Sequence, residues 1–254
     1  MPVTKSAGST LAAAVCAALL LTGCTDTSSV SPAPQAPAKR PAGHAGPGPH
    51  KPSVRHIPGL GPDFRSRIPG GTRQALVVSG GTADTNVAET TLYENGSESG
   101  KGDDWRRVAG PWPAHNALRG WTHDHNAGDL RTPIGVFGLG DAGGLEPDPG
   151  TRLPYDQDEE FVAPGTGFLG EPLEGSFDYV IAIDYNRVPG TSPLDKERPL
   201  GPEKGSGLWI HVDHEGPTQG CISLPRERMR ELLRLLDPDK RPVVVMGPAP
   251  ELRK

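Results

Sequence analysis

A cysteine and a histidine near the C-terminal end of the chain have the residue types of a nucleophile and its base. Cys221 closes the segment Thr218-Gln219-Gly220-Cys221, and His211 precedes it by ten positions. A thiol becomes a nucleophile when a neighbouring base takes its proton, which predicts a cysteine nucleophile with His211 as its base. The alternative is a buried cysteine that acts as an inert small hydrophobe.

Two elements are expected to position this pair. Residues 207–212 have the pattern of a strand that delivers His211 near its end, and residues 225–236 form one convincing helix with Met229, Leu232, Leu233 and Leu236 on a single stripe. A cysteine on a turn just before a helix lies near free N–H groups and the positive end of the helix dipole, which favours a thiolate. The strand end and the turn are expected to face each other.

From about residue 73 to residue 247 the chain alternates strand-like runs with Gly, Pro, Asn and Asp. The apolar or alternating runs lie at 74–78, 90–93, 134–137, 177–186 and 242–246. About 175 residues of this kind predict one mainly-β domain that is large enough to bury its own core.

The N-terminus predicts export. Residues 11–21 are an apolar run that is too short to span a bilayer comfortably, as in a signal peptide. The run ends in Leu21-Thr22-Gly23-Cys24, which resembles the bacterial lipobox, so residues 1–23 are expected to be a lipoprotein signal peptide and Cys24 the lipidated first residue. An ordinary signal peptide with a chance cysteine is the alternative. With Cys16 removed and Cys24 lipidated, Cys221 is the remaining free thiol and no internal disulfide is expected.

Residues 24–68 are expected to hold the lipidated cysteine and a disordered tether. Seven prolines lie in Ser31–Pro52 among Ala, Gly, Ser and Lys, without the apolar periodicity that a core requires. The folded domain is expected at 69–248, with a tail at 249–254. A net charge of −5 and the lack of a basic run argue against nucleic-acid binding, so membrane contact is expected through the lipid.

Histidines and carboxylates supply an alternative chemistry, a zinc or iron site. One such group is His211-Val212-Asp213-His214, and the other is His123-Asp124-His125 with Asp129. These spacings also occur in ordinary loops, and a metal hydrolase would not need the cysteine. No metal is therefore predicted.

Several segments together resemble the L,D-transpeptidase catalytic domain. Ile210-His211 followed by Thr218-Gln219-Gly220-Cys221-Ile222 resembles its signature, in which a histidine precedes a Ser/Thr-His-Gly-Cys turn. Residues 128–137 resemble the family's Thr-Pro-x-Gly-x-Phe strand entry, and residues 179–186 resemble the strand ahead of the active site. The resemblance covers roughly residues 73–247 and implies a mainly-β fold, a β-sandwich with few short helices.

The resemblance implies an enzyme that uses peptidoglycan stem peptides as donor and acceptor, without a metal or cofactor. Cys221 would attack the carbonyl between the third, diamino residue and the terminal D-Ala, and an amine of a neighbouring stem would resolve the thioester into a 3-3 cross-link. His211 would be the base. The backbone N–H of Cys221, with that of Gly220 or Gln219, would hold the oxyanion. Gly220 would leave room for the carbonyl or supply a positive φ.

Two positions depart from the family's pattern. Gln219 stands where a histidine is usual, and Ser223 stands where an arginine commonly meets a substrate carboxylate. The residues expected to bind substrate are Gln219, Thr218, Ser223, His125 and Arg131.

The expected protein is a monomeric cell-wall enzyme, extracytoplasmic and lipid-anchored to the cell membrane. Resolution of the thioester by water would instead make it an L,D-carboxypeptidase. A slow, nonspecific reaction of Cys221 with a thiol reagent would favour a third alternative, an inert domain in a wall-binding lipoprotein.

Overall fold

Each of the predicted apolar runs forms or contains a strand in the computed structural model, which describes residues 56–97 and 104–254. These residues belong to one compact unit, Gly48–Lys254. The strands are β1 (Gln74–Gly80), β2 (Val87–Asn95), β3 (Trp105–His115), β4 (Trp121–Thr122), β5 (Thr132–Pro133), β6 (Gly135–Gly138), β7 (Ala142–Gly144), β8 (Tyr155–Gln157), β9 (Val180–Ala182), β10 (Trp209–Val212), β11 (Ile222–Leu224) and β12 (Val243–Pro248). The helices are α1 (Pro62–Arg67), α2 (Arg226–Leu235) and α3 (Ala249–Leu252), with 3-10 turns at Pro202–Lys204 and Pro238–Lys240.

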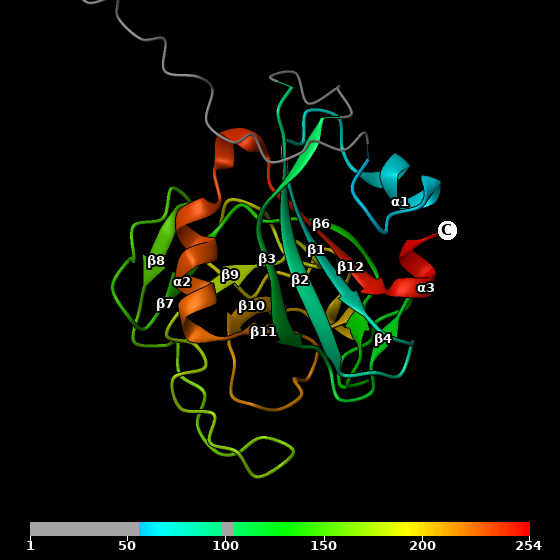
Figure 1. The fold of residues 1–254 in the computed structure, drawn as a ribbon. Coiled ribbons are helices and arrows are strands. Elements are labelled where there is room, and N and C mark those ends of the chain that lie inside the picture. The colour runs from blue at the N-terminus through cyan, green and yellow to red at the C-terminus, as the bar shows by residue number, and fades with distance from the viewer. Residues whose placement is uncertain (1–55, 98–103) are drawn as a thin grey trace, which may run out of the picture. The chain divides into compact units, whose positions relative to one another are not determined.

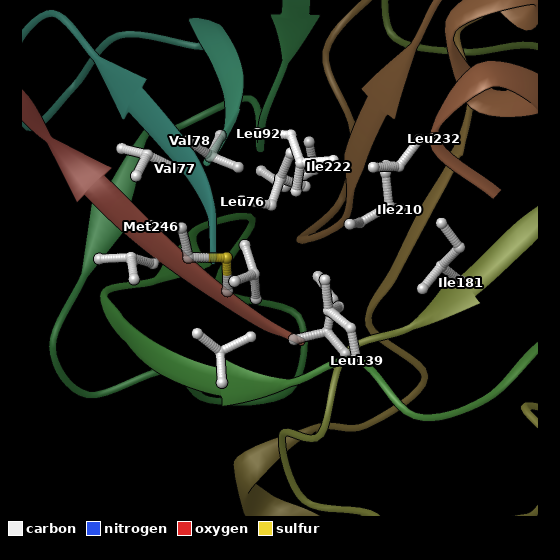
Figure 2. Packing of buried hydrophobic residues seen from close by; sticks show 14 of the residues in the cluster. Leu76, Val77, Val78, Leu92, Leu139, Ile181, Ile210, Ile222, Leu232 and Met246 are labelled. Atoms are coloured by element: carbon white, nitrogen blue, oxygen red, sulfur yellow. The ribbon is translucent and has the colours of Figure 1, made fainter. Parts of the chain in front are cut away.

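Ten of the strands form one mixed sheet in the order β6-β12-β1-β2-β3-β11-β10-β9-β7-β8, and β4 pairs with β5. One half of this sheet is β6-β12-β1-β2-β3 and the other is β11-β10-β9-β7-β8, and the apolar faces of both halves contribute to one core. Figure 2 shows Leu76 and Leu92, from β1 and β2, beside Ile222 of β11 in the other half. The mainly-β prediction with few short helices is confirmed.

The strand β3 was not predicted, because its sequence contains two residues that interrupt sheet pairing. Pro111 and Pro113 have no N–H to donate to a ladder. The pairing of β2 with β3 shifts register between Thr90 and Leu92, opposite Gly110 and Pro111, so a bulge accommodates the proline. Gly110 has φ +86 and a Cβ there would lie 2.5 Å from the Thr90 carbonyl oxygen, so this bulge requires glycine.

The helices at the two ends of the described domain extend it beyond the expected range of 69–248. Phe64 of α1 and Leu252 of α3 are almost fully buried in the core, and the Gly61 N–H donates to the Leu252 carbonyl at 2.7 Å. Residues 57–68 and 249–254 were expected to be tether and tail, respectively. Instead they pack beside β6, β12 and β1, because their apolar side chains cover that side of the sheet (Figure 1). The predicted signal peptide, Cys24 and the proline-rich segment lie outside the described residues.

The predicted helix near the C-terminal end is α2. Its apolar stripe of Met229, Leu232, Leu233 and the adjacent Leu236 is completely buried, and α2 contacts β10, which carries His211. Figure 2 shows Leu232 near Ile210 of that strand. In the part of the chain that the structure describes, we find no helix with the length and apolar character of a membrane span.

Candidate active site

Two parallel neighbouring strands bring the predicted nucleophile and base together. β10 and β11 pair with Ile210 opposite Ile222 and His211 opposite Ser223. Cys221 lies one residue before β11, and its Sγ accepts a hydrogen bond from the Trp209 N–H at 3.4 Å. His211 and Cys221 both line one cavity. The strand end and the turn thus lie side by side, as expected.

The His211 imidazole is held in one tautomer and kept neutral. Its Nδ1 lies 2.9 Å from the Val212 carbonyl oxygen, which can only accept, so Nδ1 carries the proton and Nε2 has a free lone pair. The pKa of His211 is lowered to about 4, mainly by burial; the Val212 carbonyl and Asp213 oppose this shift, and the stacked His214 ring, 5.8 Å away, adds to it. A buried, neutral imidazole with a free Nε2 is a proton acceptor at neutral pH.

The Cys221 thiol is also neutral, contrary to the expected thiolate. Burial raises its pKa to about 11, and the Trp209 N–H opposes this only in part. The expectation of stabilisation by a helix was wrong because β11 separates Cys221 from α2, which begins at Arg226. Within the described residues Sγ has hydrogen-bond contacts to the Trp209 N–H and, at 3.7 Å, to the Gly207 carbonyl, and none to the His211 ring.

The turn before Cys221 presents free backbone donors. Among the residues that the structure describes, the N–H groups of Gln219, Gly220 and Cys221 have no hydrogen-bond acceptor. The turn is closed by the Thr218 hydroxyl, which donates to the Cys221 carbonyl at 2.6 Å, and it is tied to the neighbouring loop by the Thr218 N–H, which donates to the Asn116 carbonyl at 3.0 Å. Free, fixed N–H groups beside a thiol are the donors that a developing oxyanion needs.

Limited space, and not backbone conformation, favours glycine at position 220. Gly220 does not have a positive φ, which excludes one of the two reasons expected for it. A Cβ at this position would lie 2.8 Å from Leu208 Cδ2 and 3.6 Å from His125 Cε1. A larger residue would therefore press on the wall of the site.

The cysteine and the histidine line a common cavity of about 440 Å³. Of the other predicted residues, His125, Thr218, Gln219 and Gly220 also line it. Gln219 is exposed, whereas the hydroxyl of Thr218 is used within the turn. His125 is buried, with Nδ1 3.0 Å from Asp129 Oδ1 and its ring edge-on to Tyr185.

Two residues expected to bind substrate do not reach the cavity. Ser223 is fully buried, and its hydroxyl donates to Asp213 Oδ1 at 2.6 Å because position 223 lies inside β11. The guanidinium of Arg131 instead donates to Asp84 at 3.2 Å and to the Trp121 carbonyl at 3.1 Å. Neither side chain lines the cavity.

The loop at residues 166–173 contributes to the wall of the cavity, although no sequence pattern predicted this. Phe168 lines the cavity from this loop, and Glu171 Oε1 lies 3.2 Å from His214 Nδ1. A Cβ on Gly167 or on Gly216 would overlap the Glu171 carboxylate, so these two glycines allow the loop to approach. Gly167 and Gly216 are the sequence signals that could have indicated this contact.

The described residues do not bring together the ligands of the alternative metal site. Residues 56–97 and 104–254 contain no group of three or more His, Cys, Asp or Glu side chains that could hold a metal ion. His214 is directed to Glu171, whereas Asp213 lies 2.8 Å from His115 Nδ1.

The fold and the site define a class of protein: a mainly-β domain with a cysteine, a histidine and free backbone donors in one cavity. The family model of YkuD, the L,D-transpeptidase catalytic domain, matches residues 80–245. The match spans more than half of the chain and includes Cys221 and His211, and the chain belongs to this family. Comparison with curated proteins and with solved structures found no match. The family acts on peptidoglycan peptides.

Proposed function

We propose that the protein is a peptidoglycan L,D-transpeptidase that forms 3-3 cross-links through a thioester on Cys221. The observation that supports this most strongly is the shared cavity, in which Cys221 Sγ, the His211 ring and the free N–H groups of the turn lie together. These are the groups that acyl transfer through a covalent intermediate requires.

The first half-reaction uses His211 as base and then as acid. As Sγ attacks the carbonyl between the third residue and D-Ala, Nε2 takes the thiol proton and a C–S bond forms. The N–H groups of Gly220 and Cys221 hold the oxyanion, for which one such donor contributes a factor of about 10² to 10³. The C–N bond then breaks, and His211 returns the proton to the amine of the departing D-Ala.

The second half-reaction reverses these roles. The side-chain amine of a neighbouring stem attacks the thioester while His211 takes its proton, the C–S bond breaks, and Cys221 regains a proton. Because burial keeps both side chains uncharged in the free protein, the proton moves during the attack and not before it. Resolution by water at the same site would give an L,D-carboxypeptidase.

We expect the purified chain to convert a tetrapeptide muropeptide into a cross-linked dimer with the loss of one D-Ala. Mass spectrometry of the products measures this directly. Trimmed monomers without dimers would identify the carboxypeptidase reaction, and unchanged tetrapeptide under conditions where the chain is folded would contradict both activities.

We also propose, from the sequence resemblance to the lipobox, that Cys24 anchors the enzyme to the membrane on the side of the cell wall. Cys24→Ala is expected to move the protein from the membrane fraction to the soluble fraction or to leave its signal peptide uncleaved. Fractionation with immunodetection and intact mass measure the two results. Cys16→Ala is the matched control, because it removes a thiol from the segment expected to be cleaved. A Cys24→Ala variant that stays anchored and is processed like the parent would exclude the lipid anchor.

A further inference from the structure

The wall of the cavity contains one permanent charge. In the described part of the chain the lining residues include no Asp, Glu or Lys, and Arg198 is the one arginine among them. The His211 ring is kept neutral by burial, as described above. The cavity is therefore suited to an anionic group, and the guanidinium of Arg198 is the feature that would receive it.

Within residues 56–97 and 104–254, the guanidinium of Arg198 makes no hydrogen bond or ion pair with a protein group, and the residue is exposed. Arg187, on the same loop, shows the contrast, because its guanidinium is buried against Asp141 at 2.8 Å. Arg198 thus keeps all its donors available for a ligand.

The backbone around Arg198 is nevertheless held in place. Its carbonyl accepts a hydrogen bond from the Gly201 N–H at 2.8 Å. The buried Asn186 side chain accepts from the Leu200 N–H at 2.7 Å and donates to the carbonyls of Gly201, at 2.9 Å, and Gly205. A fixed backbone with a free charged head lowers the entropy cost of recognition, because only the side chain has to be ordered on binding.

Ser223, which was expected to bind substrate, is buried against Asp213 and does not reach the cavity, so it cannot receive an anionic group there. We propose that Arg198, which lines the cavity with an unpaired guanidinium, binds a carboxylate of the donor stem peptide. This proposal depends on the proposed function for the identity of the ligand. The carboxylate belongs either to the terminal D-Ala or to another residue of the stem peptide, and guanidinium recognition is the same for both.

Binding to a chain that cannot react tests this proposal. In a Cys221→Ala background, Arg198→Gln is expected to weaken the binding of a tetrapeptide muropeptide by about tenfold or more, as measured by calorimetry. Arg198→Lys should bind with intermediate affinity, because lysine keeps the charge but loses the planar fork. Lys196→Gln is the matched control, because it removes one positive charge from the same loop outside the cavity and should leave the affinity unchanged.

Two amidated donors identify the carboxylate. Amidation of the carboxylate that Arg198 binds should lower the affinity of the Cys221→Ala chain to that of the chain that also carries Arg198→Gln. The affinity of the chain with Arg198→Gln should not change. Amidation of the other carboxylate should preserve the difference between the two chains. If Arg198 had only a structural role, Arg198→Gln would weaken the binding of the unmodified donor and of both amidated donors equally, and this result would overturn the proposal. Equal affinity of the chains with and without Arg198→Gln for the unmodified donor would also overturn it.

Product formation by the chain with Cys221 separates this proposal from the proposed function. Arg198-dependent binding without any product would contradict the transpeptidase and keep the carboxylate site. Dimer formation by Arg198→Gln with the kcat/KM of the parent would keep the transpeptidase and reject the carboxylate site.

Discussion

Cys221→Ala is expected to abolish both the release of D-Ala and the formation of dimers, a loss of about 10⁴-fold or more, because no other group in the cavity can form the thioester. The fold should survive, since the replacement removes only one atom, beside the Trp209 N–H. The change in the free energy of unfolding should stay within about 1 kcal/mol. Product masses and thermal unfolding measure the two quantities.

A carbapenem provides a second measurement of the same residue. Its strained carbonyl needs a nucleophile and oxyanion donors but no recognition of a stem peptide. The parent chain should therefore gain the mass of one carbapenem at Cys221, and the alanine variant none. Dimer formation by Cys221→Ala would reject Cys221 as the nucleophile. The lack of an adduct on the folded parent would favour the inert wall-binding alternative.

The strands could be predicted where the local pattern and the tertiary environment agree. β1 and β12 are buried on both faces, and their β-branched runs carry that information in the sequence. β3 could not be predicted, because a bulge that depends on its partner β2 accommodates Pro111. The end helices were missed for a related reason. Phe64 and Leu252 become core residues only when the sheet edge they cover exists.

The positions of Cys221 and His211 followed from their short separation and from the strand that carries the histidine. Substrate contacts were harder to predict, because the direction of a side chain depends on distant partners. The Ser223 side chain is buried because the residue lies within β11 and its hydroxyl donates to Asp213, while the Arg131 guanidinium donates to Asp84. Arg198 lies in an irregular loop whose place is set by Asn186, so no periodicity identified it.

The low pKa of His211 predicts an unusual pH dependence for a cysteine enzyme. Since the imidazole becomes protonated only near pH 4 and the thiol ionises only near pH 11, kcat/KM for donor cleavage should fall as the pH drops through about 4 and stay level through neutral pH. The free energy of unfolding should also decrease as the pH falls over this range. The unfolded chain binds a proton at His211 at higher pH than the folded chain does, so the contribution of His211 is present above its unfolded pKa of about 6.5 and is lost as the pH falls toward 4.

His211→Ala should slow acylation by about 10² to 10⁴ at neutral pH, because no group then takes the thiol proton. The rate that remains should increase toward pH 11, where the thiolate of Cys221 forms without a base. The decrease in stability between about pH 6.5 and 4 should become smaller in the same variant. His123→Ala is the matched control for activity, since this exposed histidine pairs with Glu251 outside the cavity and should leave the pH profile of kcat/KM unchanged. Full activity of His211→Ala would show that another group accepts the proton, and the stacked His214 would then be the first residue to replace. A parent profile with its midpoint near pH 7 would contradict the lowered pKa of His211.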